Sequence, residues 1–268
     1  MTKLEKLKAI LAGMDSVLVA YSGGADSTFL VKVASLSVAG KVIAVTAVSA
    51  TYPKKELSAA AGNARRIGVR HVVIKTSEVS KRAFSANTTE RCFVCKSELF
   101  SKLRRMAEGR GTGFVLDAST VSDEKDFRPG NRAKKRFGIR SPLAEAGLTK
   151  DDIRRYSRKM GLATWDKPSA ACLASRIPYG TKITPALLRR VDQAERFFRH
   201  LGCGQVRVRD YTTLARIEVS GSDLARIVEN RTRVVTRLKA LGYHYVTVDL
   251  EGYRTGSMNE VVKKEVRQ

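Results

Sequence analysis

A short apolar strand that runs directly into a glycine-rich loop and a helix is the feature that most constrains this chain. The strand is expected at Val17–Tyr21, the loop is the run SGGADS at 22–27, and the helix follows over 27–36. Gly23 and Gly24 permit positive φ angles and let main-chain N–H groups approach an anion closely. The helix N-terminus adds further N–H donors and the positive end of its dipole. We therefore interpret the run as a phosphate-binding loop rather than a plain turn.

The side chains of this loop suit a polyphosphate bound together with magnesium. Ser22, Ser27 and Thr28 offer hydroxyls, and Asp26 offers a carboxylate that can hold Mg²⁺. No lysine follows the glycines, so the loop is not of the GxxxxGK[ST] type. The pattern SGGxDS resembles the pyrophosphate loop of the PP-loop ATP pyrophosphatases. That resemblance implies that ATP is cleaved between its α and β phosphates while an oxygen of the substrate is adenylated.

Strands and helices alternate over about the first 150 residues, which predicts a Rossmann-like α/β fold with a parallel sheet and helices on both faces. Nucleotides bind such sheets at the carboxyl ends of the strands, where the loop falls. The strands are expected at Val17–Tyr21, Val42–Val48, Val72–Lys75 and Phe114–Asp117, and the helices at Ser27–Leu36, Lys54–Ile67, Arg91–Glu108 and Thr149–Met160.

The pattern changes in the second part of the chain, which predicts a smaller C-terminal α+β domain. We expect a first domain over 1–165, a linker over 166–182 with two prolines and the run SRIPYGT, and the smaller domain over 183–268. The elements of that domain are expected at Pro185–Leu201 (helix), Gln205–Arg209 and Ala215–Val219 (strands), Ser222–Leu241 (helix) and Tyr245–Leu250 (strand).

The chain is strongly basic, with a formal net charge of +24 over 268 residues. Such a charge favours polyanionic partners, which include nucleotides and nucleic acids. The basic residues are spread along the chain and aromatic residues make up only 7%, so a solvated basic surface is the simplest interpretation. No apolar run approaches the roughly 18 residues needed to span a bilayer, and Met1–Leu11 has the pattern of an amphipathic helix, so we expect a cytoplasmic enzyme.

Four cysteines stand out, three of them with a spacing that suits metal binding. Cys92 and Cys95 form a CxxC pair at the start of an expected helix, and Cys172 lies in the linker. Three thiolates without a fourth ligand suit a 4Fe–4S cluster with one open iron, but the spacing is equally compatible with a redox pair or a zinc site. Cys203 is interpreted as a buried or incidental thiol. Lys96, beside Cys95, can lower a thiolate pKa or be an ordinary solvated lysine.

Further motifs resemble one family within the PP-loop superfamily. They are Asp117–Gly130, Ser175–Thr181, the run VRVR at 206–209 and Gly242–Asn259, and the likeness spans about 11–259. In order and spacing they are similar to the LarE family, ATP-dependent sulfurtransferases of nickel-pincer cofactor biosynthesis. The resemblance implies that each carboxylate of pyridinium-3,5-biscarboxylic acid mononucleotide is adenylated, and that sulfur then replaces the oxygen that carries the AMP.

Members of that family differ in their sulfur source. Some sacrifice the sulfur of one cysteine, whose position matches Ala171 here. Others carry a CxxC pair and a later cysteine that hold a 4Fe–4S cluster, and Cys92, Cys95 and Cys172 match this type. The resemblance therefore implies ATP, Mg²⁺ and a 4Fe–4S cluster as cofactors, with sulfide or a cysteine desulfurase as a possible donor, and a homo-hexameric assembly.

The resemblance also implies roles for individual residues. Ser22, Gly23, Gly24, Asp26 and Ser27 would hold the ATP phosphates and magnesium, and Asp123, Asp126 and Arg128 would lie over the nucleotide. Arg207 and Arg209 occupy alternate positions of a strand, so they share a face and can bind one phosphate, although a solvated strand face is the alternative. Arg176 and Arg254 are similar candidates, and Glu195 and Glu218 match acids near the sulfur site.

Two other functions stay open at this point. A tRNA thiolase that uses a 4Fe–4S cluster would explain the net charge of +24, although no added RNA-binding domain is recognisable and we do not expect nucleic acid as the partner. A metal or sulfide carrier with a vestigial nucleotide fold is the second. Binding of bulk tRNA at physiological salt would favour the first of these.

Overall fold

The computed structural model describes residues 1–124, 130–168 and 171–260, and divides into two compact units. The first unit comprises Met1–Phe84 and Thr89–Ala170, and the second comprises Ser85–Thr88 and Ala171–Gln268. The short segment 85–88 joins the second unit because Ile183 N donates to Ser85 O at 2.8 Å and the Asn87 side chain donates to Pro178 O at 2.6 Å.

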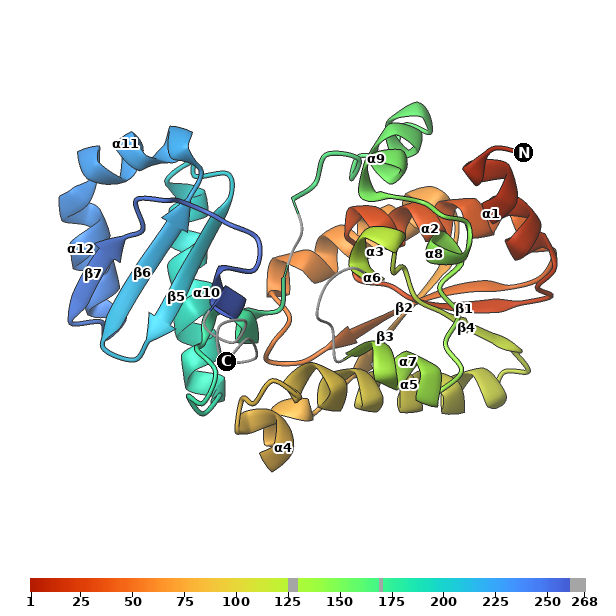
Figure 1. Cartoon of the computed structure of the whole chain (residues 1–268), viewed down its shortest axis with the longest axis horizontal. Coiled ribbons are helices and arrows are strands. Elements are labelled where there is room, and N and C mark those ends of the chain that lie inside the picture. Colours follow the sequence, from red (N-terminus) through yellow and green to blue (C-terminus); the bar gives the residue numbers. More distant parts are fainter. Residues whose placement is uncertain (125–129, 169–170, 261–268) are drawn as a thin grey trace. The chain divides into compact units, whose positions relative to one another are not determined.

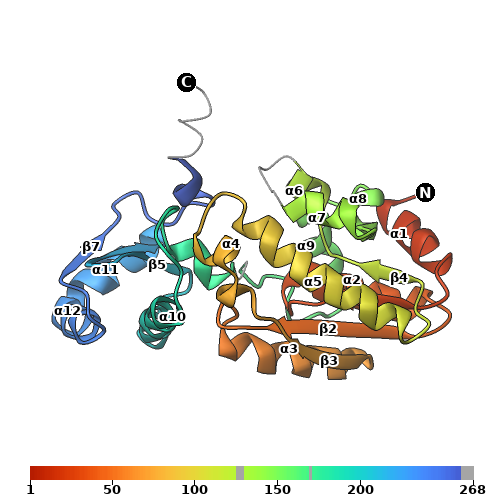
Figure 2. The same ribbon diagram turned by 90° about the horizontal axis from the view of Figure 1, so that it is seen from below.

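A four-stranded parallel sheet in the order β3-β2-β1-β4 forms the centre of the first unit. Figures 1 and 2 show this unit from two directions. The chain moves outward from β1 to β3 and then returns to place β4 on the other side of β1. This reversal lies between β1 and β4, and ligands of open α/β sheets bind beyond the carboxyl ends of the strands at such a point. The strands are β1 (Val17–Ala20), β2 (Val42–Val48), β3 (Arg70–Lys75) and β4 (Phe114–Leu116).

Helices cover both faces of this sheet, which confirms the predicted fold class (Figure 1). One face packs against α1, α2, α3, α8 and α9 through apolar side chains such as Phe29, Ala64 and Leu143, and the other packs against α5 and α7 through Phe100, Leu103 and Ala133. These helices are α1 (Lys3–Ala12), α2 (Ala25–Ser37), α3 (Lys54–Ile67), α5 (Arg91–Glu108), α7 (Gly130–Arg136), α8 (Pro142–Glu145) and α9 (Lys150–Lys159); α4 (Arg82–Ser85) and α6 (Val121–Glu124) are short.

The second unit has a mixed three-stranded sheet in the order β5-β6-β7, antiparallel between β5 and β6 and parallel between β6 and β7. Side chains alternate across its strands, so Val206, Val208 and Ile217 join the helices in one core while Arg207 and Glu218 lie on the other face. The elements are α10 (Pro185–His200), β5 (Val206–Tyr211), β6 (Leu214–Val219), α11 (Gly221–Glu229), α12 (Arg231–Ala240) and β7 (Tyr245–Val248), with the 3₁₀ turns η1 (Glu78–Ser80), η2 (Leu173–Arg176) and η3 (Ser257–Asn259).

The single helix expected over Ser222–Leu241 was a wrong prediction, because two helices stand there. The N–H of Asn230 still bonds to Arg226 O, but Asn230 has φ −97 and ψ 19, outside the helical region, and α12 begins at the next residue. Both helices then bury their own apolar positions, Ile227 on α11 and Val234 with Leu238 on α12, in one core. None of the helices within the described ranges combines the length and the apolar character that crossing a bilayer requires.

Candidate functional site

The loop after β1 forms a compact cradle at the start of α2. The hydroxyl oxygens of Ser22 and Ser27 lie 3.1 Å apart, and the Ser27 hydroxyl donates to Gly24 O at 3.3 Å. Gly23 has a φ of +70°, and a Cβ added there would lie 2.7 Å from the Cβ of Ala60 on α3. Only glycine satisfies both conditions at position 23. Gly24 instead has a φ of −80°, which any residue adopts, and a Cβ added there would meet only Ser22 Oγ at 3.4 Å.

Two side chains hold successive carbonyl groups of this loop. The Tyr52 hydroxyl donates to Ser22 O at 3.0 Å, and the Lys167 ammonium donates to Gly23 O at 3.0 Å. Because the C=O and N–H of a peptide unit point in opposite directions, these bonds turn the N–H groups of Gly23 and Gly24 away from Tyr52 and Lys167. Burial, and then the charge of Glu56, raise the pKa of Tyr52, so its hydroxyl remains a donor at neutral pH.

The segment that follows β4 begins beside the loop that follows β1, because β4 and β1 are parallel neighbours in the sheet. Asp117, which directly follows β4, accepts hydrogen bonds from Ser119 Oγ at 2.7 Å and Ser141 Oγ at 2.6 Å. Asp123 is buried and accepts bonds from the N–H and hydroxyl of Thr120, each at 3.0 Å, which caps the short helix α6. Asp123 thus orders the loop next to β1, while Asp126 and Arg128 lie outside the described residues.

Cys92 and Cys95 lie on the first turns of α5. Three positions apart on a helix, the two side chains share one side of it, and Cys92 is exposed while Cys95 is half-buried. Two accessible thiols with this placement can supply two ligands to one metal centre. The Lys96 ammonium lies 5.3 Å from the ring centre of Phe100, and a Cβ on Gly130 would meet Lys96 Cγ at 3.1 Å, so α7 packs closely on this helix.

Glu98, one turn beyond Cys95, anchors α5 to the segment after β3. Its carboxylate accepts the Ser77 N–H at 2.8 Å and pairs with Lys81 at 2.8 Å and Lys102 at 3.2 Å. Burial opposes its ionisation, but the hydrogen bonds from Lys81, Ser77 and Lys102 prevail and lower the pKa of Glu98 to about 2. The carboxylate therefore stays ionised in the folded protein and fixes the helix that carries the CxxC pair.

We expect the Glu98→Gln variant to lose stability at neutral pH but much less in acid. The unfolded chain protonates Glu98 below its ordinary pKa of 4.5, whereas the folded chain does so only near 2. The contribution is therefore complete above about pH 4.5 and disappears as the pH falls toward 2, with an upper limit of about 3 kcal/mol. Urea unfolding at pH 7 and pH 3 measures this difference. Glu108→Gln, on an exposed position of the same helix, is the control, and a difference that does not shrink at pH 3 contradicts the prediction.

Arg176 forms hydrogen bonds with the backbone at Cys172 and at the residue before it. Its guanidinium forms a buried two-point ion pair with Glu195, at 2.7 and 3.0 Å, and also donates to Ala171 O at 2.6 Å and Cys172 O at 2.9 Å. All three guanidinium nitrogens are thus engaged within the protein. Burial opposes ionisation of Glu195, but the charge and hydrogen bond of Arg176 prevail and lower its pKa. Arg176 and Glu195 together set the position of the Cys172 segment.

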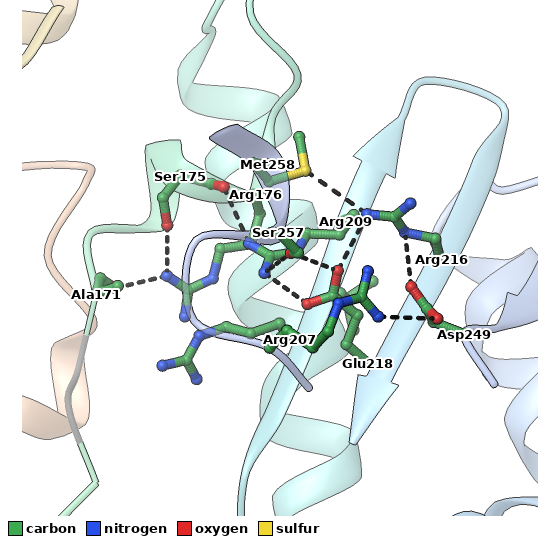
Figure 3. A network of polar contacts seen from close by, with 12 residues as sticks. Ala171, Ser175, Arg176, Arg207, Arg209, Arg216, Glu218, Asp249, Ser257 and Met258 are labelled. Atoms are coloured by element: carbon green, nitrogen blue, oxygen red, sulfur yellow. Dashed lines mark hydrogen bonds and ion pairs between the residues drawn. The ribbon is translucent and has the colours of Figure 1, made fainter. Parts of the chain in front are cut away.

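A buried polar network occupies the face of the second sheet opposite its helices (Figure 3). Arg209 donates to Glu218 at 2.5 Å, to Ser257 Oγ at 2.9 Å and to Ser175 O at 3.1 Å. The Ser257 hydroxyl in turn donates to Glu218 at 2.9 Å. Residues far apart in the sequence therefore cover β5 and β6 and bury the charged side chains.

Arg207 adds a positive charge beside the ion pairs Arg176–Glu195 and Arg209–Glu218. Arg207 lies 5.2 Å from the ring centre of Tyr253 and donates to Val206 O. Burial, and then the charge of Arg176, lower the pKa of Arg207 to about 10 although Glu195 acts in the other direction. An anion bound nearby would relieve this crowding. Arg254 is half-buried at the edge of this network, where it pairs with Asp249 at 3.7 Å, with Glu251 at 2.9 Å and with Glu260.

The described residues of each unit, taken by itself, contain no group of three His, Cys, Asp or Glu side chains that could hold a metal ion. Cys92 and Cys95 belong to the first unit and Cys172 to the second, so a shared cluster stays a prediction. Cys203 is buried, in line with a packing role.

The sequence did not predict several residues of these sites. Tyr52, Glu56 and Lys167 contact or adjoin the loop, and Ser257 completes the arginine network. Each of them reaches its partner over 30 or more positions in the sequence, so no local pattern marks it. The one available sequence feature is that Lys167 stands just before Pro168, in the segment interpreted as a linker.

A Rossmann-like α/β sheet with a glycine-rich loop between β1 and α2, joined to a small mixed-sheet unit, defines the class of protein. No family model matches the chain. It is 42% identical to an uncharacterised protein of Synechocystis over 98% of this chain and 99% of that protein. It is 36% identical to the pyridinium-3,5-bisthiocarboxylic acid mononucleotide synthase of Lactiplantibacillus plantarum over 98% of this chain and 96% of the synthase. It is also 31% identical to an uncharacterised protein of Methanocaldococcus jannaschii over 89% of this chain and 91% of that protein. The chain belongs to the LarE family, which confirms the resemblance found in the sequence.

Proposed function

We propose that this protein is an ATP-dependent sulfurtransferase that converts carboxylates of pyridinium-3,5-biscarboxylic acid mononucleotide into thiocarboxylates. The observation that carries the proposal is the 36% identity, over 98% of the chain, to the synthase of the corresponding bisthiocarboxylic acid mononucleotide. The glycine-rich loop and the buried arginine network support it, because the reaction needs a site for a polyphosphate and a site for a substrate phosphate.

In the proposed reaction a substrate carboxylate oxygen attacks the α-phosphate of ATP, and pyrophosphate leaves. The resulting acyl adenylate is then attacked at its carbonyl carbon by sulfide, a thiocarboxylate forms, and AMP leaves with the original oxygen. The N–H groups of Gly23 and Gly24 and the α2 N-terminus would hold the phosphates, and Asp26 would hold magnesium. Arg207 and Arg209 would bind the substrate phosphate, with Glu218 orienting Arg209 at 2.5 Å.

The thiols of Cys92, Cys95 and Cys172 would hold a 4Fe–4S cluster. Two observations support this assignment: the thiols of Cys92 and Cys95 share one side of α5, and Cys172 is exposed at the start of η2. When bound, the cluster would supply the sulfide. Arg176 and Glu195 would fix the Cys172 backbone during this transfer, and the alanine at position 171 excludes a sacrificed cysteine there.

Anaerobic turnover followed by mass analysis tests the proposal. The reconstituted protein is incubated with MgATP, sulfide and the pyridinium substrate, and we expect AMP, pyrophosphate and a product in which sulfur has replaced oxygen. An unchanged protein mass is expected, whereas a loss of one H₂S would show a consumed cysteine. Pyrophosphate release that does not depend on the substrate, with no thiolated product, contradicts the proposal.

A second candidate is thiolation of tRNA, which the net charge of +24 favours. A gel shift with bulk tRNA at physiological salt separates the two, because non-specific binding weakens steeply as salt rises. Tight binding of tRNA together with sulfur incorporation into it would replace the first proposal.

A further inference from the structure

We propose that Lys167 is a phosphate-contacting residue of the ATP site, which supplies the positive charge that the loop at 22–27 lacks; this inference rests on the proposed function. Its ammonium lies 3.0 Å from Gly23 O, a carbonyl of the loop, and 2.6 Å from the Glu56 carboxylate at the first turn of α3. The loop itself contains one carboxylate and neither lysine nor arginine.

The backbone presents this side chain in a defined place. The Lys167 N–H donates to Thr164 O at 3.2 Å, and the Trp165 N–H donates to Leu162 O at 3.1 Å, so the segment after α9 is folded into turns. Lys167 and Glu56 are each largely buried, with 22% and 21% of their side chains exposed. A charge held in this partly desolvated position acts more strongly on a nearby anion than a surface lysine does.

The charge balance explains why the lysine would change partners. ATP with one magnesium ion carries about two negative charges at neutral pH, and the backbone N–H groups of a loop and a helix offer only partial positive charges. The ammonium rests on the carbonyl side of Gly23, so it has to leave both Glu56 and Gly23 O to reach a phosphate held by the N–H groups of the loop. Its flexible four-carbon stem allows this change of partners. Glu56 then acts as the resting partner that keeps the ammonium beside the loop until the phosphates bind.

Calorimetric binding of MgATP to four variants of the full-length protein tests this. We expect Lys167→Met to weaken binding about tenfold, since one charge-assisted contact of about 1.4 kcal/mol is lost. Lys167→Arg should recover part of the affinity. Glu56→Gln should bind at least as tightly as the wild type, because the lysine no longer has to leave a carboxylate. Lys3→Met, which breaks a 2.6 Å ion pair with Asp152 on the far helices α1 and α9, is the matched control.

The outcomes separate the possible failures. Equal affinities of the wild type and Lys167→Met overturn the inference and leave the proposed function intact. If Glu56→Gln and Lys167→Met weaken binding equally, Lys167 is a structural tether and the inference is also wrong. If the wild type does not bind MgATP, both the proposed function and the inference fail. Thermal unfolding without nucleotide shows whether a variant has lost its fold, and the Lys167→Arg variant then carries the test.

Discussion

Replacing Cys172 with alanine is expected to remove the brown colour of anaerobically reconstituted protein and to lower sulfur transfer at least about 100-fold. Three thiolates are the smallest protein ligand set that suits a 4Fe–4S cluster with an open iron. A variant with only two of them is therefore expected not to bind the cluster stably. The same result is expected for Cys92→Ala and Cys95→Ala. Iron content, absorbance in the visible range and thiolated product are measured on the same samples.

Cys203→Ala is the matched control, because Cys203 is buried in the core of the second unit with 3% of its surface exposed. It should keep both colour and activity, at a modest cost in stability. A wild-type protein that stays colourless and takes up one zinc ion after reconstitution would contradict the prediction. A Cys172→Ala variant with full iron content would instead show that the linker thiol is not a ligand.

Replacing Gly23 with alanine is expected to weaken MgATP binding about 100-fold and to destabilise the first unit by roughly 2 to 4 kcal/mol. An alanine at φ +70° is strained, and its Cβ would stand 2.7 Å from Ala60 Cβ on α3. The loop must then move away from α3, which breaks the alignment of the N–H groups toward the phosphates. Calorimetry and urea unfolding measure the two effects.

Gly62→Ala on the same helix is the control for this substitution. A Cβ at Gly62 meets no atom within 4 Å, so alanine there should leave MgATP binding unchanged and stabilise α3 by about 0.5 to 1 kcal/mol. If Gly23→Ala binds MgATP as well as Gly62→Ala does, the loop is not the phosphate site, and the assignment of the nucleotide to this edge of the sheet is wrong.

The hydrogen bonds from Arg176 to the carbonyl groups of Ala171 and Cys172 give the arginine network a structural role, besides the anion binding that we propose for it. Arg176 was expected to bind the substrate phosphate, but the structure commits its guanidinium to Glu195 and to the carbonyls of residues 171 and 172. Arg209 is engaged in the same way by Glu218, Ser257 and Ser175, so it would have to exchange a partner to bind the phosphate, as Arg176 would. Arg207 is the remaining candidate on this strand. The roles of these arginines stay predictions that the binding of a substrate phosphate to the purified protein can test.

The sequence by itself determined the class of fold, the glycine-rich loop between the first strand and its helix, and the boundaries of the strongly patterned elements. Helices Lys54–Ile67 and Arg91–Glu108 and strand Val42–Val48 stand where the sequence predicted them. Pro53 precedes the first of these helices, and Gly68, with φ +83°, ends it. Both are local signals for the start and the end of a helix. Such signals act over a few residues, so they can be read without knowing the rest of the molecule.

Tertiary structure alone decided which distant side chains complete each site. It placed β4 beside β1, broke the helix at Asn230, and brought Lys167 to Glu56 across 111 positions. It also buried Arg209 with Glu218 and Ser257, which lie on separate segments. These pairings depend on how whole helices and strands pack, and no periodicity within one segment encodes them.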